Sequence, residues 1–526
     1  MKPVQLGPFL GLNTRLEDFA LSTKEGAYLS AASNVYLDKA GRLHRRPGLT
    51  LIQAMTGAHS LFKNYLVRGS ALYRITLLTY SETLVKVLAS DDPMSYAEHD
   101  GSIYYSNGTD AGRIGSDGAV YPWALPTPSA PATSNIAGTL TAGKYLVAVG
   151  YANATTGEEG GLSASTVVTL SAAGAIRVTL PGATTGATHV KVYVSKLNGT
   201  ALGLYSTVAT GTATVDITTT TTGKTGQDKY IEPMPACTNL FIHMGRLCGT
   251  KGDTLYYSEP YRMGYYRADK GFIRFESAIS VAAPNQSGVY VVTDKTQWIP
   301  GDVATPADMI RDVRNYGAVP GTVFSFPTIT LVGWVGDKGF VVADDQGQVT
   351  SPTEDVIDFD PPASGTAYVM ELAKERLVVS CGYCMNLETN SITKWDGYAL
   401  NSLSEGYGIA PVGVLSLSGD TDNGSEIAST IGLGRQNFQT EELKHLIACY
   451  VGVASPEKMA VTVTLPDERE YTYTTRSSDA ALKMQRFDLG RGLRANWFGL
   501  TLSNTNGADF TLASASIEAK ASNRRI

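Results

Sequence analysis

Charge is scarce in this chain. Asp, Glu, Lys and Arg make up 17% of the 526 residues, against roughly 25% in an average globular domain. The formal net charge of -6 leaves no excess of basic residues with which to hold phosphates. Sequence-specific nucleic-acid binding is therefore not expected, although DNA could pass such a surface without being held.

Long apolar runs and a cysteine framework are also missing. No window reaches the roughly 18 apolar residues of a membrane span, and residues 1–22 lack the apolar core of a signal peptide. The cysteines are odd in number and scattered, which does not fit paired disulfides. We therefore expect a protein made in a reducing cytoplasm that stays soluble and has no membrane-spanning segment. The five are Cys237, Cys248, Cys381, Cys384 and Cys449.

Helical periodicity is rare as well. It is best at residues 25–35 and 440–448, where we expect helices. Elsewhere, short runs rich in Val, Thr and Tyr are separated by turn dipeptides that favour hairpins. The predicted fold class is all-β. The dipeptides are Asp100-Gly101, Asn107-Gly108, Asp117-Gly118, Asn198-Gly199, Asp396-Gly397 and Asn506-Gly507.

Residues 127–225 lie between a Pro-rich stretch and a Thr-rich stretch, both typical of linkers. Within them, two runs alternate large apolar residues with other residues, so that each strand has one buried face. This pattern predicts an immunoglobulin-like or fibronectin III-like sandwich inserted into a host domain. The alternating residues are Tyr145, Val147, Val149 and Tyr151, then Val190, Val192 and Val194.

The segments on either side of this insertion contain loosely similar units. The sequences HDGSIYYS (from His99) and MGRLCGTKGDTLYYSEP (from Met244) share a Gly turn followed by a strand ending in Tyr-Tyr-Ser. Such repeats predict a β-propeller over residues 56–126 and 226–400, with room for about five or six blades. Residues 401–526 alternate again and predict a C-terminal β-sandwich. The clearest alternation there is Met459, Val461, Val463 and Leu465.

Residues 1–55 are interpreted as an N-terminal platform or assembly segment. They contain a stretch rich in small residues, a strand beginning Asn34-Val35, a turn at Gly41 and the run Arg45-Arg46-Pro47-Gly48. This arrangement resembles the start of tail nozzle and tail hub proteins (tail tubular protein B-like) of short-tailed bacteriophages. The pieces LYYSEP (255–260) and GVYVVTDKTQWIPGD (288–302) look like blade strands of the same family. The resemblance implies a six-fold ring of propeller subunits below the portal and adaptor, with the N- and C-terminal portions meeting in a platform. The matching positions are Gly11, Asn13, Ala31, Asn34, Val35, Gly41, Arg45, Arg46, Pro47 and Gly48.

The same segment contains the candidate interface residues. A short hairpin followed by a rigid proline would place a dense cationic tip where arginines can form bidentate pairs with carboxylates of a neighbouring subunit. A solvated turn is the alternative. The candidates are Asn34, Arg42, Arg45, Arg46 and Pro47.

Chemical motifs are incomplete. Gly223-Lys224-Thr225 lacks the first glycine of a phosphate-binding loop, and Cys381-Gly382-Tyr383-Cys384 lacks two further zinc ligands. Carboxylate doublets on a strand point to opposite faces and make poor glycosidase pairs. The acidic loop at 419–426 is interpreted as a surface turn. We therefore predict no catalytic residue, no metal site, no cofactor and no enzymatic activity. The doublets are Asp91-Asp92, Glu158-Glu159, Asp344-Asp345 and Asp467-Glu468.

Together these features favour a virion structural protein, a nozzle or hub assembled in the host bacterial cytoplasm. It would form a homo-oligomeric, hexameric ring around the DNA ejection channel and dock the tail adaptor and the tail fibres or spikes. Two alternatives stay open. One is a receptor-binding or carbohydrate-binding tail protein, and the other is a propeller glycosidase or depolymerase.

Overall fold

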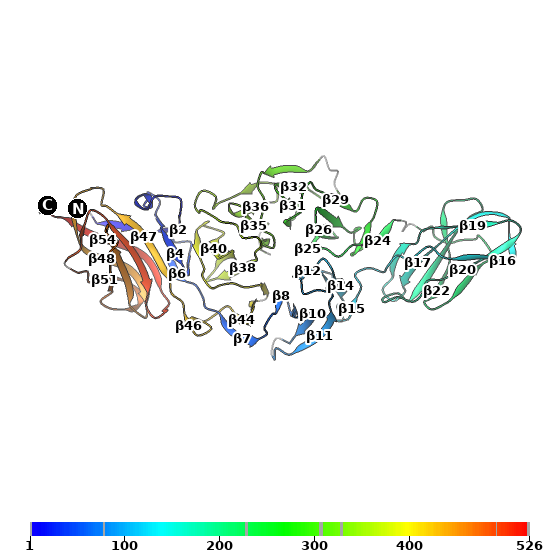
Figure 1. Ribbon diagram of the computed structural model, residues 1–526, viewed down its shortest axis with the longest axis horizontal. Helices are drawn as coiled ribbons and strands as arrows, with labels where there is room; N and C mark the ends of the chain where they lie inside the picture. Colours follow the sequence, from blue (N-terminus) through cyan, green and yellow to red (C-terminus); the bar gives the residue numbers. More distant parts are fainter. Residues whose placement is uncertain are drawn as a thin grey trace. The chain divides into compact units, whose positions relative to one another are not determined.

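The computed structural model describes residues 3–76, 79–226, 230–304, 309–326, 330–404, 406–490 and 492–522. Strands and turns make up these residues, apart from one short 3-10 helix at Asp18–Ala20, which confirms the predicted all-β class. Figure 1 shows the strands. The chain folds into two compact units. Unit 1 contains residues 1–84, 294–297 and 312–526, and unit 2 contains residues 85–293 and 298–311.

In unit 1, strands from both ends of the chain share two sheets. The sheet order β5-β6-β54-β48-β51, with β1 also on β54, puts N-terminal strands beside the last strand. This sheet comprises β1 (Val4–Leu6), β5 (Val35–Leu37), β6 (Leu43–Arg45), β48 (Lys444–Ser455), β51 (Asp479–Phe487), β52 (Arg494–Ala495) and β54 (Thr511–Ala521).

The second sheet of unit 1 has nine strands and packs against the first. Its order is β38-β39-β40-β41-β4-β47-β53-β49-β50, so N-terminal β4 lies between β41 and β47. The alternation expected at 459–465 is observed, because all four apolar residues are buried in the core shared with β48 and β54. The strands are β38 (Ala367–Leu372), β39 (Glu375–Ser380), β40 (Tyr383–Asn386), β41 (Ile392–Lys394), β4 (Ala31–Ser33), β47 (Thr430–Gln436), β53 (Phe498–Asn504), β49 (Met459–Thr464) and β50 (Glu470–Thr474).

Both predicted helices are wrong. Residues 25–35 contain β3 (Ala27–Leu29) and β4, and Asn34 has a φ of 58°, which interrupts any regular element there. Residues 440–448 lead into β48, which pairs with β54 along most of its length. In both places the pairing offered by distant strands outweighs the local helical pattern.

Unit 1 also contains four-stranded antiparallel sheets. One of them combines β7, from the N-terminal region, with three strands from much later in the chain, in the order β42-β43-β44-β7. Its strands are β7 (Thr50–Ala54), β42 (Ser402–Ser404), β43 (Tyr407–Ala410) and β44 (Gly413–Ser416). A second comprises β34 (Phe324–Ser325), β35 (Val332–Gly336), β36 (Gly339–Ala343) and β37 (Val349–Thr350). Further strands are β2 (Phe9–Leu12), β8 (His59–Phe62), β9 (Tyr65–Val67), β10 (Ala71–Ile75), β45 (Thr421–Asp422) and β46 (Ser425–Glu426).

Unit 2 contains two more four-stranded sheets, β12 to β15 and β25-β26-β27-β29. They comprise β12 (Ser95–His99), β13 (Ser102–Ser106), β14 (Ala111–Ile114), β15 (Val120–Tyr121), β25 (Thr238–His243), β26 (Arg246–Lys251), β27 (Thr254–Tyr257) and β29 (Phe272–Arg274). The other strands outside the insertion are β24 (Ile231–Pro233), β28 (Tyr265–Arg267), β30 (Val281–Pro284) and β31 (Gly288–Val292). The strands β11 (Glu82–Val87), β32 (Thr296–Pro300) and β33 (Arg311–Arg314) lie where the chain passes from one unit to the other.

Between β15 and β24, two antiparallel sheets pack on one core. The orders are β16-β20-β23 and β18-β17-β21-β22, with β19 also on β17. Val147 and Val192 of one sheet and Ile176 and Val178 of the other are all buried in that core. The relation of this body to immunoglobulin-like domains stays a prediction. The strands are β16 (Thr133–Leu140), β17 (Gly143–Asn153), β18 (Glu158–Leu162), β19 (Thr166–Leu170), β20 (Gly174–Thr179), β21 (His189–Ser195), β22 (Leu202–Ala209) and β23 (Thr214–Ile217).

Within the described part of the chain, no helix has the length and apolar character needed to cross a bilayer.

Candidate functional site

A buried arginine joins the N-terminal hairpin to the C-terminal half of unit 1. The side chain of Arg46 is 1% exposed, and its guanidinium lies over the Tyr398 ring with 5.0 Å between the Cζ atom and the ring centroid. Each of its five N–H groups finds an acceptor, so the charge is fully hydrogen-bonded. The acceptors are Asn34 Oδ1 (2.8 Å), Pro47 O (3.1 Å), Asp396 O (2.8 Å), Asp422 Oδ1 (2.9 Å) and Asp422 Oδ2 (2.5 Å).

The other candidate interface residues surround this arginine. Asn34 is buried and also donates from its side chain to the carbonyl of Ala428. Arg45 is buried and donates to the Asp420 carboxylate at 2.6 Å. Arg42 is 44% exposed and pairs with Asp38 within the same turn, and Pro47 is half-buried.

The predicted hairpin is present, since β5 and β6 pair from Val35 to Arg45. The prediction of a cationic tip is wrong. Arg45 and Arg46 lie at the base of the hairpin, where carboxylates of the same chain neutralise them. Their contact with a neighbouring subunit stays a prediction. Of the three arginines, Arg42 has the most exposed side chain. The acidic loop at 419–426 supplies the carboxylate partners, which the interpretation as a surface turn missed.

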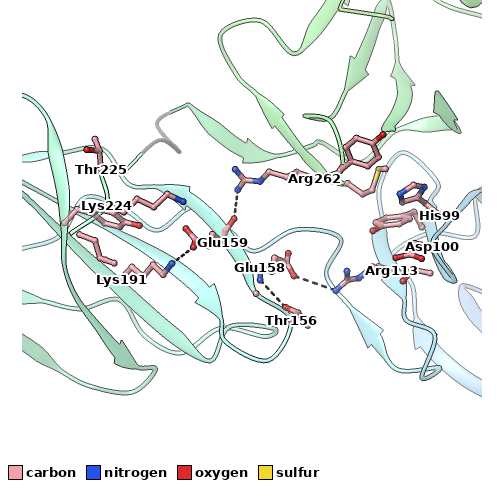
Figure 2. Close-up of a pocket in the computed structure, with 18 residues that line it drawn as sticks. His99, Asp100, Arg113, Thr156, Glu158, Glu159, Lys191, Lys224, Thr225 and Arg262 are labelled. Carbon is pink, nitrogen blue, oxygen red and sulfur yellow. Dashed lines mark hydrogen bonds and ion pairs between the residues drawn. The ribbon is translucent and has the colours of Figure 1, made fainter. Parts of the chain in front are cut away.

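A second candidate site lies in unit 2. A cavity of about 670 Å³ is lined by residues of β13, β14, β18, β21 and β22 and by the segments 224–226 and 261–263. Figure 2 shows positive and negative side chains around it, among them Arg113, Lys191, Glu158 and Glu159.

The two adjacent glutamates of β18 are held by different partners. Glu158 accepts a hydrogen bond from the Tyr265 hydroxyl at 2.7 Å, and its other oxygen lies 3.7 Å from Arg113. Glu159 forms an ion pair with Lys191, and its backbone carbonyl accepts a bond of 2.6 Å from Arg262. Burial, reinforced by the negative charge of Glu158, raises the pKa of Tyr265 above its usual range, so its hydroxyl remains a donor at neutral pH. The carboxylates of the two glutamates therefore bond to different residues, Tyr265 and Lys191, although both side chains line the same cavity.

The incomplete motifs fall in ordinary structural settings. Thr225 forms a β-bridge with Gly203, and Lys224 lines the cavity. Cys381 and Cys384 are free thiols, and burial raises the pKa of both. Among the described residues, no group of three or more His, Cys, Asp or Glu side chains is placed to hold a metal.

No family model and no curated protein matches this chain. Similar solved structures include an exo-beta-1,3-galactanase from Phanerochaete chrysosporium, at 11% identity and a TM-score of 0.18, covering 93% of this chain and 99% of that one. A glycoside hydrolase family 43 arabinoxylan arabinofuranohydrolase from Bacillus subtilis has 10% identity and a TM-score of 0.20, covering 81% and 95%. The extracellular domain of a hybrid two-component system from B. thetaiotaomicron has 10% identity and a TM-score of 0.25, covering 97% and 92%.

These matches correct one expectation. The sequence predicted that the chain has no enzymatic activity, and the glycoside hydrolases among its structural matches contradict that prediction, which we withdraw. At these TM-scores the matches assign neither a substrate nor a catalytic residue to this chain.

Proposed function

We propose that this chain is a structural subunit of a phage tail, a nozzle or hub that assembles into a ring around the DNA ejection channel. Its four-stranded sheets would be blades of a β-propeller, and the two large sheets of unit 1 would form the platform. Three strands of the segment at 11–48, which resembles nozzle proteins, belong to these two sheets: β4, β5 and β6.

The observation that carries the proposal is how this segment is built into unit 1. Strand β4 lies between β41 and β47, and β6 lies between β5 and β54. Arg46 then bonds to the backbone of Asp396 and to the carboxylate of Asp422. A platform of N- and C-terminal portions is what the resemblance implies, and these contacts support it.

A second observation supports the propeller. Strand β7 completes the sheet that β42, β43 and β44 begin, through pairs such as Thr50 with Ser416. Joining an early strand to the last sheet of a repeat series covers an open edge, which closed β architectures require.

The platform also has a surface suited to self-association. Strand β51 is nine residues long and ends its sheet, so much of its backbone is available for pairing. Two apolar side chains of this strand are exposed, Leu482 at 49% and Met484 at 60%. Head-to-tail contacts through such an edge can close into a ring.

Electron microscopy of the purified chain, alone and mixed with the tail adaptor, tests this proposal. We expect hollow rings in end-on views and a multiple of the subunit mass by light scattering. The double variant Leu482→Lys, Met484→Lys should shift the protein to monomers, whereas Val167→Lys in β19, which changes another exposed apolar residue, should leave the ring intact. A chain that stays monomeric even with the adaptor would overturn the proposal.

The glycosidase alternative is tested on the same sample. Loss of polysaccharide viscosity on incubation with the purified chain would favour a propeller glycosidase or depolymerase over a purely structural subunit.

A further inference from the structure

The proposed ring makes no use of the cavity of unit 2, and the lining of this cavity identifies a class of ligand. Side chains of both charges line it: Arg113, Lys191, Lys224 and Arg262 are cationic, and Asp100, Glu158 and Glu159 are anionic. A phosphate or another anion would meet three carboxylates, and a metal ion or amine would meet four cations. A neutral ligand with many hydroxyl groups meets neither obstacle, because each hydroxyl both donates and accepts hydrogen bonds.

Several polar groups of the cavity are held in place before any ligand arrives. Glu158 is fixed by Tyr265, whose hydroxyl also accepts a bond of 2.7 Å from the backbone N–H of Leu125. Arg262 is fixed by its bond to the Glu159 carbonyl and by the Tyr265 ring, 5.1 Å from its Cζ atom. A site whose side chains are already ordered loses little conformational entropy on binding.

An aromatic ring stands at the edge of the cavity. Tyr261 is 79% exposed although its backbone is held at a φ of 57° and its N–H donates to the Gly245 carbonyl at 2.7 Å. The ring lies against Gly245, where an added Cβ would come within 3.0 Å of the Tyr261 Cζ atom. One face of the ring is thus supported by backbone, and the exposed fraction leaves the other free to stack on an apolar surface.

From these features we propose that the cavity binds a neutral saccharide, with one sugar face stacked on Tyr261 and its hydroxyls bonded to the charged lining. The inference does not depend on the tail assignment, because it rests on the residues that line and support the cavity and on no contact between subunits.

The test uses the full chain on an array of neutral and acidic bacterial surface oligosaccharides. We expect binding to neutral oligosaccharides, weakened at least about tenfold in Tyr261→Ala by loss of the stacking surface. Tyr261→Phe keeps the ring and should bind like the wild type. The matched control is Tyr471→Ala, which removes a partly exposed tyrosine from β50 in unit 1 and should not change binding.

Competition experiments distinguish a site for single sugar units from a site for longer chains. Free glucose or galactose that displaces the oligosaccharide indicates a site for single sugar units, and displacement by longer fragments alone indicates a site for chains; both support the proposal. Binding restricted to acidic glycans, no binding to the array, or full binding by a folded Tyr261→Ala variant would overturn it. An unchanged melting temperature shows that the variant is folded.

Discussion

Arg46 in unit 1 and Arg113 in unit 2 both face carboxylates, yet their surroundings differ. Arg46 is buried and each of its five N–H groups has an acceptor, two of them oxygens of Asp422. Arg113 lies beside the cavity, 3.7 Å from Glu158, and its Nε has no hydrogen-bond partner among the described residues. The first arginine has no donor left for a ligand, whereas the second lines a space that a ligand can enter.

The difference shows that the free-energy cost of burying a charge is offset in two ways in this chain. Around Arg46 the chain itself supplies every acceptor, which suits a joint that must stay closed. Around the cavity the charges keep contact with solvent, which suits a site that exchanges water for ligand hydroxyls. The first arrangement should control stability, and the second should control recognition.

Substituting Arg46 is expected to have the largest effect. Arg46→Leu removes one donor from the Asn34 oxygen, from each oxygen of the Asp422 carboxylate and from two carbonyls, and should lower the free energy of unfolding of unit 1 by about 3–5 kcal/mol. Urea titration with pulsed thiol labelling measures it, because Cys449 is buried in unit 1 and Cys237 in unit 2. The urea concentration at which Cys449 becomes labelled should fall, while the urea concentration at which Cys237 becomes labelled should not change.

Arg42→Leu is the control for this prediction. It removes an arginine of the same hairpin whose pair with Asp38 is solvent-exposed, and such pairs contribute less than about 1 kcal/mol. Equal effects of the two substitutions would mean that the Arg46 contacts do not hold unit 1 together.

The next largest effect is expected in unit 2. Tyr265→Phe removes the donor to Glu158 and the acceptor for the Leu125 N–H, which should cost about 1–3 kcal/mol. In the same pulsed-labelling experiment, Cys237 should now become labelled at a lower urea concentration, and the urea concentration at which Cys449 is labelled should not change. If Tyr265→Phe destabilises unit 1 as much as unit 2, the contacts of Tyr265 do not act on unit 2 alone, and the contrast between the two units is contradicted.

Local patterns in the sequence predicted much of the fold. Turn dipeptides and alternating apolar residues gave the all-β class, the hairpin at 35–45 and the buried face at 459–465, because hairpin turns and strand faces depend on neighbouring residues. The strands at 25–35 were missed because β41 and β47, which flank β4, come from far along the chain.

The candidate sites depend on pairings that no local pattern contains. Asp422 is 376 positions from Arg46, and Tyr265 is 107 positions from Glu158. Sequence analysis singled out Arg46 and the Glu158-Glu159 doublet. It could not identify their partners, because the pairing of distant strands brings those partners close. Sequence reasoning therefore predicted an exposed tip where the structure has a buried joint, and it did not predict the cavity beside the doublet.

The smallest expected effect is a loss of unfolding free energy at alkaline pH, which can be measured separately for the two units. Burial raises the pKa of Cys449 in unit 1 and of Cys237 in unit 2, each to about 12, whereas a thiol in an unfolded chain has a pKa of about 8.5. Above pH 8.5 the unfolded chain binds fewer protons than the folded one, so the stability from each neutral thiol is present below that pH and is lost as the pH rises toward 12. Between pH 8.5 and 9.5, each group should contribute a loss of about 1 kcal/mol.

Cys449→Ala should therefore flatten the fall in unfolding free energy of unit 1 over this range, and Cys237→Ala that of unit 2. In each variant, pulsed labelling of whichever of Cys237 and Cys449 is kept reports the unchanged unit, and urea titration followed by circular dichroism gives the total. The slopes between pH values carry the result, because the cavity left by each substitution lowers stability equally at every pH. A slope unchanged by Cys449→Ala would mean that solvent reaches this thiol in folded unit 1, and the contrast between a closed unit 1 core and the open cavity of unit 2 would then be lost.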